Sequence, residues 1–335
     1  MKITLVTDTW YNVNGVVTTL TNTVRILQEW GHEVQIIEPS QFRTVGVPTY
    51  PEVRLSWDLW RVGPMIEEFK PDAIHIATEG PLGLAARYYC KVKKRSIPHN
   101  TSYHTKFPEY LKQYYGLPVD WGYWIVRWFH KFSTRVLVTS PSMKQLLADR
   151  DFHSLEVWNR GVDKSIFNSS LRKPNDLPKP VLLCVSRASI EKGLDDFCKL
   201  ETVGTKIFVG DGPYLETLKQ RYPDITFTGY KHGIELAEIY ANADVFVFPS
   251  KTDTFGVVMI EALATGTPVA AYPVTGPIDV VKDDVNGYLD ENLAAAVDRA
   301  LTCDRQAVEQ SSQQYDWAKC TETFLNNLKI ISKKF

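Results

Sequence analysis

Apolar and polar positions along this 335-residue chain alternate between two spacings. Short apolar runs predict buried strands, and 3.6-residue spacing predicts helices between them. In the first half, strands are expected at residues 2–8, 33–39, 72–78 and 135–140, with helices at 16–30, 81–94 and 142–150. In the second half, strands are expected at residues 180–186, 205–211, 243–249 and 268–273. Each of these strands is followed by a turn and a helix. This alternation is typical of βαβ units and parallel sheets.

A polar, proline-bearing stretch at residues 168–180 separates the halves and has the composition of a domain boundary. The sequence therefore predicts two doubly wound, Rossmann-like α/β domains, residues 1–168 and 169–315, which face each other across a cleft. The tail, 316–335, has the apolar spacing of a helix. Ligands of doubly wound sheets bind beyond the carboxyl ends of the strands, so the loops after the strands are the candidate sites.

Composition narrows the class of protein. The chain is 44% hydrophobic and 23% charged, with a formal net charge of −1, which argues against a dedicated nucleic-acid binder. Its five cysteines are odd in number and show no C-x-x-C spacing, so we expect reduced thiols in a cytoplasmic protein, with no disulfide frame or zinc site. The amino terminus shows no apolar signal region, and no uncharged run is long enough to cross a bilayer.

The most informative stretch is residues 249–268, where an apolar run ends in a loop and a helical pattern opens at residues 254–256. The first amides of such a helix are unpaired and, with the helix dipole, form an anion site. Two acids, Asp253 and Glu261, flank this turn. Acids beside an anion site suit a ligand that also carries hydroxyl groups. The stretch therefore predicts a nucleotide sugar.

Other loops at strand ends add to this picture. Arg187 and Lys192 follow the strand at 180–186. The Arg187 guanidinium can donate two hydrogen bonds to one phosphate and the Lys192 ammonium is a compact charge, a combination that suits a diphosphate. Gly210 follows the strand at 205–211 and permits a close backbone approach. In the first half, Gly15 opens a helix after the first strand, either to admit a ligand or because the turn requires it. The dinucleotide signature G-x-G-x-x-G is absent.

These motifs, in their order along the chain, resemble a known family. They are NGV at 14–16, SR-x4-KG at 186–193, VGDGP at 209–213 and PS-x4-FG-x4-EA at 249–262. Together they resemble the retaining glycosyltransferases of the GT-B fold, a family with sucrose synthase-like and phosphatidylinositol mannosyltransferase-like members. Strings at 75–83, 102–111, 159–163 and 272–281 resemble a narrower group of bacterial α-mannosyltransferases and diacylglycerol glycosyltransferases. The resemblance covers nearly all of the chain.

The resemblance implies roles for individual residues. Arg187 and Lys192 would bind the donor diphosphate, and Glu261 would hold the ribose hydroxyls. Asp253 would lie near the donor sugar, at a position where the family usually has Glu, and His104 would lie beside the same sugar. The other donor-side positions implied are Gly15, Gly210, Thr254, Phe255, Gly256 and Val257, with Gly210 near the base. In this fold the tail helix crosses back onto the first domain.

The same resemblance implies retaining transfer. Breaking the anomeric C–O bond places charge on the departing nucleoside diphosphate, and stabilising that charge is the main electrostatic task. Because no His/Asp cluster has convincing metal-ligand spacing, we expect Arg187, Lys192 and the helix amides to replace a divalent ion. No cofactor and no metal are expected, and a UDP- or GDP-sugar is the substrate.

Several residues keep two interpretations. Asp253 either caps the following helix or contacts the sugar. Glu79 either faces the acceptor or belongs to a turn, while His75 and His130 are interpreted as structural. The remaining acceptor-side candidates are Tyr103, Trp121 and Trp124.

The aromatic stretch at residues 107–132 is either core of the first domain or an interfacial patch at a membrane. A basic run at 91–95 would add attraction to anionic lipid in the second case. A lipid acceptor such as diacylglycerol is therefore preferred, which implies a cytoplasmic or peripheral enzyme at the inner face of the cell membrane.

Three alternatives stay open at this point. One is a GDP-mannose-dependent α-mannosyltransferase acting on a phosphoinositol or glycan acceptor. The others are a sugar-nucleotide epimerase and a non-catalytic nucleotide-sugar-binding protein. The choice between UDP and GDP, the sugar, the linkage and the oligomeric state are not fixed by the sequence.

Overall fold

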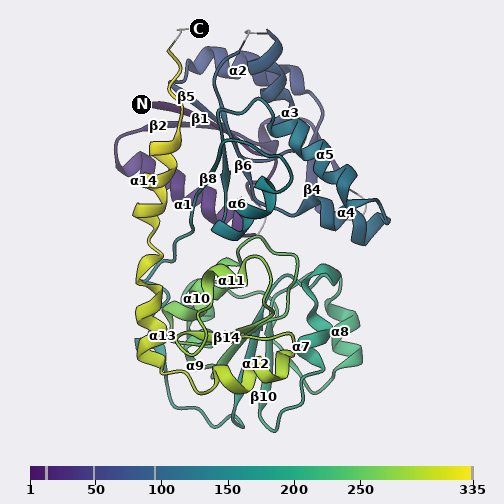
Figure 1. Cartoon of the computed structure of the whole chain (residues 1–335), viewed down its shortest axis with the longest axis vertical. Helices are drawn as coiled ribbons and strands as arrows, with labels where there is room; N and C mark the ends of the chain where they lie inside the picture. Colours follow the sequence, from purple (N-terminus) through teal and green to yellow (C-terminus); the bar gives the residue numbers. More distant parts are fainter. Residues whose placement is uncertain (12–13, 48–49, 94–95, 333–335) are drawn as a thin grey trace. The chain divides into compact units, whose positions relative to one another are not determined.

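The computed structural model describes residues 1–11, 14–47, 50–93 and 96–332 (Figure 1). The chain divides into two compact units, one formed by Met1–Arg160 with Trp317–Phe335 and the other by Gly161–Asp316. The boundary thus lies upstream of the polar stretch at 168–180. Each unit is a Rossmann-like α/β domain built on a six-stranded parallel sheet, which confirms the predicted fold class.

The sheet of the first unit has the order β2-β1-β5-β6-β7-β8. Its strands are β1 (Lys2–Val6), β2 (Glu33–Ile37), β5 (Ala73–Ile76), β6 (Asn100–Tyr103), β7 (Arg135–Val138) and β8 (Leu155–Val157). A separate antiparallel pair, β3 (Thr44–Val47) and β4 (Tyr50–Ser56), follows β2. The chain order reverses at β1, so the loops after β1 and β5 meet at the carboxyl edge.

The helices of the first unit are α1 (Gly15–Glu29), α2 (Val62–Phe69), α3 (Pro81–Tyr88), α4 (Phe107–Tyr115), α5 (Val119–His130) and α6 (Pro141–Ala148). The helix predicted at 81–94 therefore continues past α3 only as a π-helical turn, η3 (Tyr89–Lys93). The aromatic stretch forms the helix pair α4 and α5, and Gly116, at φ 67°, ends α4 in the left-handed conformation.

The tail forms α14 (Trp317–Asn327), which lies beside α1 (Figure 1). Trp317, Phe324 and Leu328 are buried in one cluster with apolar side chains of β1 and α1. The Asn100 amide of β6 donates to Asn327 O at 2.6 Å and accepts from Lys329 N at 3.2 Å. The tail is therefore part of the core of the first unit.

The sheet of the second unit has the order β11-β10-β9-β12-β13-β14. Its strands are β9 (Val181–Val185), β10 (Thr205–Val209), β11 (Thr226–Phe227), β12 (Val245–Phe248), β13 (Val269–Ala271) and β14 (Gly287–Leu289). Its helices are α7 (Leu194–Cys198), α8 (Leu215–Arg221), α9 (Gly233–Asn242), α10 (Val257–Ala264), α11 (Pro277–Val280), α12 (Leu293–Ala300) and α13 (Arg305–Ser311). Three-residue 3-10 turns complete the two units: η1 (Pro39–Gln41), η2 (Leu59–Arg61), η4 (Ser169–Leu171), η5 (Ile190–Lys192) and η6 (Ser312–Gln314).

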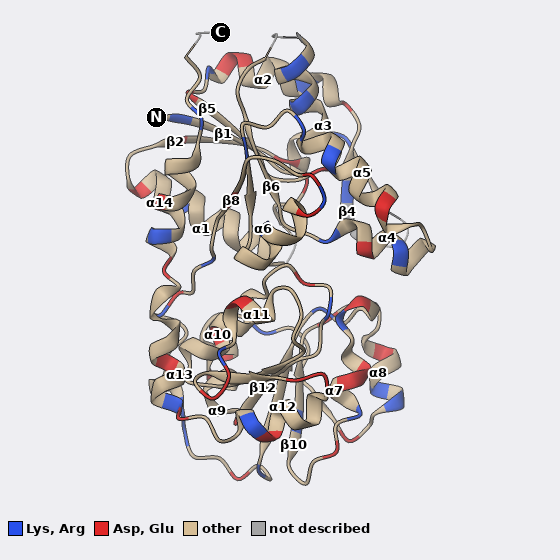
Figure 2. Cartoon of the chain, viewed as in Figure 1, with Lys and Arg blue, Asp and Glu red and all other residues tan. Residues whose placement is uncertain are grey.

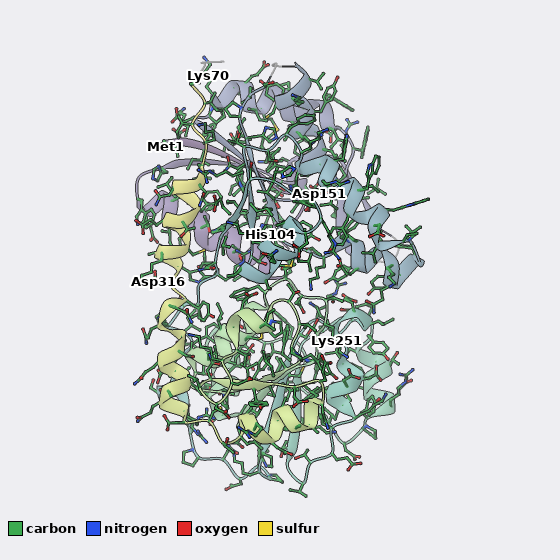
Figure 3. All side chains as sticks on the ribbon, in the orientation of Figure 1. Met1, Lys70, His104, Asp151, Lys251 and Asp316 are labelled. Carbon is green, nitrogen blue, oxygen red and sulfur yellow. The ribbon has the colours of Figure 1, made fainter. Side chains whose placement is uncertain are left out.

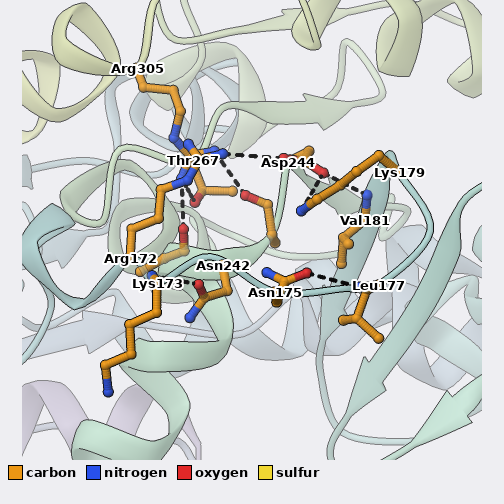
Figure 4. A network of polar contacts seen from close by, with 12 residues as sticks. Arg172, Lys173, Asn175, Leu177, Lys179, Val181, Asn242, Asp244, Thr267 and Arg305 are labelled. Atoms are coloured by element: carbon orange, nitrogen blue, oxygen red, sulfur yellow. Dashed lines mark hydrogen bonds and ion pairs between the residues drawn. The ribbon is translucent and has the colours of Figure 1, made fainter.

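The polar stretch 168–180 is fastened to the second unit rather than hanging between units (Figure 4). The Asp244 carboxylate accepts from Val181 N at 2.8 Å and pairs with Lys179 at 3.2 Å and Arg172 at 3.5 Å. Lys173 N donates to Asn242 Oδ1 at 2.8 Å. Residues 168–180 have the composition of a linker, but they pack against the second unit next to the start of β9.

We expect Phe324→Ala to destabilise the first unit strongly. The ring is completely buried, 4.9 Å from the rings of both His75 and Trp158. Truncating a buried Phe costs about 3–5 kcal/mol, to be measured by urea unfolding followed by tryptophan fluorescence. The exposed neighbour Glu322→Ala should change stability by no more than about 0.5 kcal/mol. Equal effects of the two substitutions would contradict the docking of α14.

Candidate active site

The loops that follow β9, β10, β12 and β13 gather at the carboxyl edge of the second sheet. The chain runs outward from β9 through β10 to β11, then returns to β12 on the other side of β9. The sheet order therefore reverses between β9 and β12, and such switch points are where doubly wound sheets bind ligands. Three of the predicted site residues, Arg187, Lys192 and Asp253, lie on the two loops that flank this point.

An ion pair joins these two loops. Lys192 Nζ lies 2.6 Å from Asp253 Oδ1, and the two side chains are only 18% and 19% exposed. Thr252 Oγ1 donates to Glu191 O at 3.1 Å, which ties the same loops a second time. Gly193, at φ 63°, approaches Pro249 O so closely that a Cβ would lie 2.9 Å from it. The cation is thus held at a fixed place beside the turn before α10.

The turn before α10 differs in detail from the prediction. The helix begins at Val257 rather than at Thr254, and its N-cap is Gly256, at φ 91°, without a side-chain cap. A Cβ on Gly256 would lie 2.9 Å from Met259 Cε and from Phe248 Cζ, so only glycine fits. Asp253 is therefore not the N-cap residue, which leaves the first amides of α10 without a capping side chain at this position. Thr254 and Phe255 are buried in the turn.

Glu261 lies on α10, on the side of Tyr240. Tyr240 is completely buried, and its hydroxyl donates to Glu261 Oε2 at 3.2 Å. Burial raises the pKa of Glu261 to about 7, although the Tyr240 hydrogen bond acts in the opposite direction. A half-buried carboxylate in such a setting needs hydroxyl or amide partners to remain charged. Its chemistry suits a ligand that offers hydroxyl groups.

Arg187 and Gly210 complete the predicted donor side. Arg187 is the second residue after β9 and is half-buried. Gly210 has φ 144°, and a Cβ there would lie 1.8 Å from Ser186 O. The contact between the β9 and β10 loops therefore already requires glycine at position 210, independently of any ligand.

Lys251 is a further cation at this edge and was not among the predicted site residues. Lys251 Nζ lies 3.9 Å from the centre of the Tyr272 ring, and the Tyr272 hydroxyl donates to Asp196 Oδ2 at 2.9 Å. Lys251 stands on the β12 loop two residues before Asp253 (Figure 3). Its place in the loop after a buried strand was the available signal. It adds positive charge to the same sheet edge.

In the first unit, Asp8 is the second residue after β1 and was not among the predicted site residues. Its carboxylate accepts from Leu82 N at 2.8 Å, Thr78 Oγ1 at 2.8 Å and Gly83 N at 3.3 Å. Burial raises the pKa of Asp8, against the effect of these hydrogen bonds. A Cβ on Gly80 would lie 2.4 Å from Asp8 Cγ, so glycine makes room for this carboxylate. Asp8 therefore occupies the amino-terminal end of α3, where an anion would otherwise bind.

The acceptor-side candidates divide into buried and exposed residues. Glu79 Oε1 lies 3.2 Å from His130 Nε2, and the His130 ring also bonds Thr101 Oγ1 at 2.7 Å. Tyr103 is completely buried in the core and so offers no surface to a ligand. Trp121 and Trp124, in contrast, are 67% and 63% exposed on α5. The aromatic stretch thus supplies both core and surface.

His104 and Gly15 lie at loops after strands, as predicted. Gly15 is the exposed first residue of α1, whose N-cap is the Asn14 side chain accepting from Val17 N at 2.9 Å. His104 follows β6 and is only 8% exposed (Figure 3). Its Nδ1 lies 2.9 Å from Arg160 Nη2, and burial, then the Arg160 charge, lowers the pKa of His104 well below its ordinary value.

Acidic side chains that could bind a metal are paired with other groups instead. One Asp-x-Asp triplet is present, at Asp149 and Asp151 beyond α6. Asp151 pairs with Arg127 at 3.1 Å, and Asp149 Oδ1 accepts from Gln145 at 2.7 Å. Among the described residues, no group of three or more His, Cys, Asp or Glu side chains has the arrangement of a metal site. In the same part of the chain, no helix is long and apolar enough to span a membrane.

Family models match both units. Residues 13–165 match the model described as Glycosyltransferase Family 4, and residues 167–317 match Glycosyl transferases group 1. The two matches meet close to the boundary between the structural units.

Relatives match over most of the chain. A sulfoquinovosyl transferase of Arabidopsis thaliana is 32% identical, over 94% of this chain and 70% of the relative. A GDP-mannose-dependent alpha-mannosyltransferase of Corynebacterium glutamicum is 29% identical, over 99% and 90%. An alpha-monoglucosyldiacylglycerol synthase of Streptococcus pneumoniae is 27% identical, over 90% and 78%.

Solved structures share the fold. HepE of Anabaena, in complex with UDP and glucose, has a TM-score of 0.72 and 18% identity, over 97% of this chain and 98% of that one. The two Rossmann-like units, the two matching family models and the relatives agree. The chain belongs to the group 1 glycosyltransferases and has the GT-B fold.

Proposed function

We propose that this glycosyltransferase is retaining and metal-independent, and that it moves a hexosyl group from a UDP- or GDP-sugar to an acceptor hydroxyl. The observation that carries this proposal is the Lys192–Asp253 pair, fixed beside the uncapped start of α10 at the switch point of the second sheet. We assign donor binding to the second unit and acceptor binding to the first.

In the proposed reaction, the anomeric C–O bond breaks and its electron pair goes to the diphosphate. The acceptor oxygen forms the new bond on the same face of the sugar, and its proton goes to the departing diphosphate oxygen. Arg187, Lys192 and the first amides of α10 stabilise the charge that develops on that group. Asp253 holds Lys192 and reaches the sugar side of the diphosphate.

The assay that tests this proposal incubates the protein with a panel of nucleotide sugars and extracted lipids and reads products by mass. Arg187→Ala and Lys192→Ala should each lower kcat/KM, because each removes roughly 2–4 kcal/mol of transition-state stabilisation. Lys219→Ala, on the exposed surface of α8, is the matched control and should leave the rate unchanged.

Three outcomes of that assay would count against the proposal. Near-wild-type rates for both variants would remove the assigned cation roles. Loss of transfer in EDTA, with recovery on adding metal, would remove metal independence. Free sugar or an epimer formed from donor alone would favour an epimerase.

Glu261 yields a test on donor binding. Ribose hydroxyls that donate to Glu261 stabilise its ionised form, so its pKa falls on binding from about 7 in the free protein. Affinity for UDP-glucose or GDP-mannose should then rise with pH up to about 7, by at most about tenfold per pH unit, and level off above it. Both ligands carry only diphosphate diesters, which do not titrate in this range. For Glu261→Gln, calorimetry should show an affinity that does not change with pH. A wild-type affinity that is also independent of pH would contradict ribose binding by Glu261.

We further propose that the acceptor is a membrane lipid such as diacylglycerol, and that the enzyme works at the inner face of the cell membrane. The support is α5, which is apolar on both faces. Gly122, Tyr123, Val126 and Phe129 are buried on one face, whereas four large apolar side chains are exposed on the other: Trp121, Trp124, Ile125 and Trp128. Such a stripe suits the interface of a bilayer.

Basic residues occur along α3 and α5, where Figure 2 colours them blue. Arg87 donates to Phe129 O at 2.8 Å and Trp128 O at 2.9 Å, which fixes the carboxyl end of α5. Lys91 Nζ lies 4.2 Å from the centre of the Phe132 ring. Part of the basic run, residues 94–95, lies outside the described residues. The Streptococcus relative is named an alpha-monoglucosyldiacylglycerol synthase, and that name supports the same acceptor class.

Vesicle binding tests the lipid proposal. Trp121→Ser with Trp124→Ser should weaken binding to anionic phosphatidylglycerol vesicles by about tenfold or more, because two large apolar groups are lost from the interface. Trp60→Ser is the matched control, since Trp60 is 68% exposed but stands on η2. Equal losses in both proteins, or no binding by the wild type, would favour a glycan acceptor. The second arm of the substrate panel combines GDP-mannose with a phosphoinositol or glycan acceptor, because one relative is GDP-mannose-dependent.

A further inference from the structure

Arg160 is a buried cation with an unusual set of partners. It follows β8 and is 4% exposed. Its Nη1 donates to Trp158 O at 2.7 Å and to Asn159 O at 3.2 Å, and its Nη2 lies 2.9 Å from His104 Nδ1. Among the residues the structure describes, no carboxylate contributes to the pKa of Arg160, which burial lowers to about 10. A buried guanidinium without a carboxylate is costly, so its contacts call for an explanation.

The contact with His104 fixes where the imidazole proton resides. A guanidinium only donates hydrogen bonds, so His104 Nδ1 must accept from Arg160 with its lone pair. In a neutral imidazole the proton then stands on Nε2. A protonated His104 would place an N–H of Nδ1 against a donor and a positive charge against Arg160. The geometry therefore favours one protonation state and one tautomer.

The surroundings hold both rings in place. The Trp158 ring lies 5.7 Å from the His104 ring and 5.0 Å from the Arg160 guanidinium. Trp158 itself is anchored, because its indole Nε1 donates to Cys320 O of α14 at 3.1 Å. Arg160, His75 and His130 are titratable groups close to His104 in the first unit, and each of them disfavours a second positive charge there.

We propose that Arg160 is a positioning residue that fixes His104 as a neutral imidazole with its proton on Nε2. His104 then presents a hydrogen-bond donor, suited to a hydroxyl oxygen of the transferred sugar, and cannot accept a proton at that nitrogen. The role toward the sugar rests on the proposed function, whereas the protonation state is a property of the free protein.

An uncharged His104 imidazole suits the proposed reaction. The sugar gains positive, oxocarbenium character as its bond to the diphosphate breaks. An imidazolium beside it would repel that charge, whereas a neutral N–H donor binds the sugar without opposing the developing charge. Arg160 keeps His104 in the favourable state through a direct hydrogen bond and through its charge.

Nitrogen NMR of the full chain labelled with ¹⁵N-histidine tests the proposal without substrate. In the wild type, His104 should show a protonated Nε2 and an unprotonated Nδ1 throughout pH about 5.5 to 8, a range in which an ordinary histidine titrates. Arg160→Gln retains an N–H donor and should keep the tautomer while raising the pKa of His104, because the cation is gone. Arg160→Met removes the donor and should give a mixture of tautomers.

The control for losing a hydrogen-bonded guanidinium is Arg305→Met, at a half-buried position. Arg305 donates to Ala243 O at 2.8 Å and Ala241 O at 2.9 Å within the second unit, whereas His104 belongs to the first. Arg305→Met should leave the His104 signals unchanged. A wild-type His104 that is charged at neutral pH or protonated on Nδ1 would overturn the proposal, as would an unchanged tautomer in Arg160→Met. If Arg160→Met fails to fold, the wild-type and Arg160→Gln spectra decide.

Transfer kinetics supply the second measurement. Arg160→Met should lower kcat by about tenfold or more, as loss of the correct tautomer does elsewhere. At high pH, Arg160→Gln should retain most of the wild-type kcat. As the pH is lowered, its kcat should fall at a higher pH than that of the wild type. A purely structural role would lower both variants equally at every pH, which would contradict the proposal. Absence of any transfer would refute the proposed function, yet the NMR result would still decide the tautomer.

Discussion

The candidate site depends on the ion pair between Lys192 and Asp253. Strands of a sheet are fixed by their hydrogen bonds, but the loops beyond them are held only by contacts of their own. This pair and the Thr252–Glu191 hydrogen bond join the β9 and β12 loops across the switch point. Because the two charged side chains are largely removed from water, their attraction is less screened than that of a surface pair. The position of the cation beside α10 follows from that attraction.

Much of the fold was predictable because buried parallel strands read as short apolar runs. The strand β6 was not. Asn100, Thr101 and Ser102 are polar yet completely buried, so no apolar run marks them. Their partners come from elsewhere: the tail binds Asn100, His130 of α5 binds Thr101, and His75 of β5 binds Ser102. A local pattern cannot reveal a strand whose stability depends on partners as far as 227 residues away.

The site shows the same division. Arg187, Lys192 and Asp253 were predictable because each stands in a loop after an apolar run, and Glu261 because an acid among apolar helix residues needs a partner. Asp8 also follows an apolar run, but that run does not show that its carboxylate fills the start of α3, and Arg160 follows only the three-residue strand β8, which no long apolar run marks. Only the folded chain brings Asp8 to the start of α3 and Arg160 to His104. The helix start was misplaced because the left-handed Gly256, rather than Asp253, is the N-cap.

The tail has a consequence for how the protein is made. Residues near the carboxyl terminus complete a core whose other members lie within the first half of the chain. During synthesis, that core cannot be completed until α14 has left the ribosome, whereas Gly161–Asp316 is contiguous and can close beforehand. The nascent amino-terminal unit therefore exposes apolar surface for longer than the contiguous second unit does.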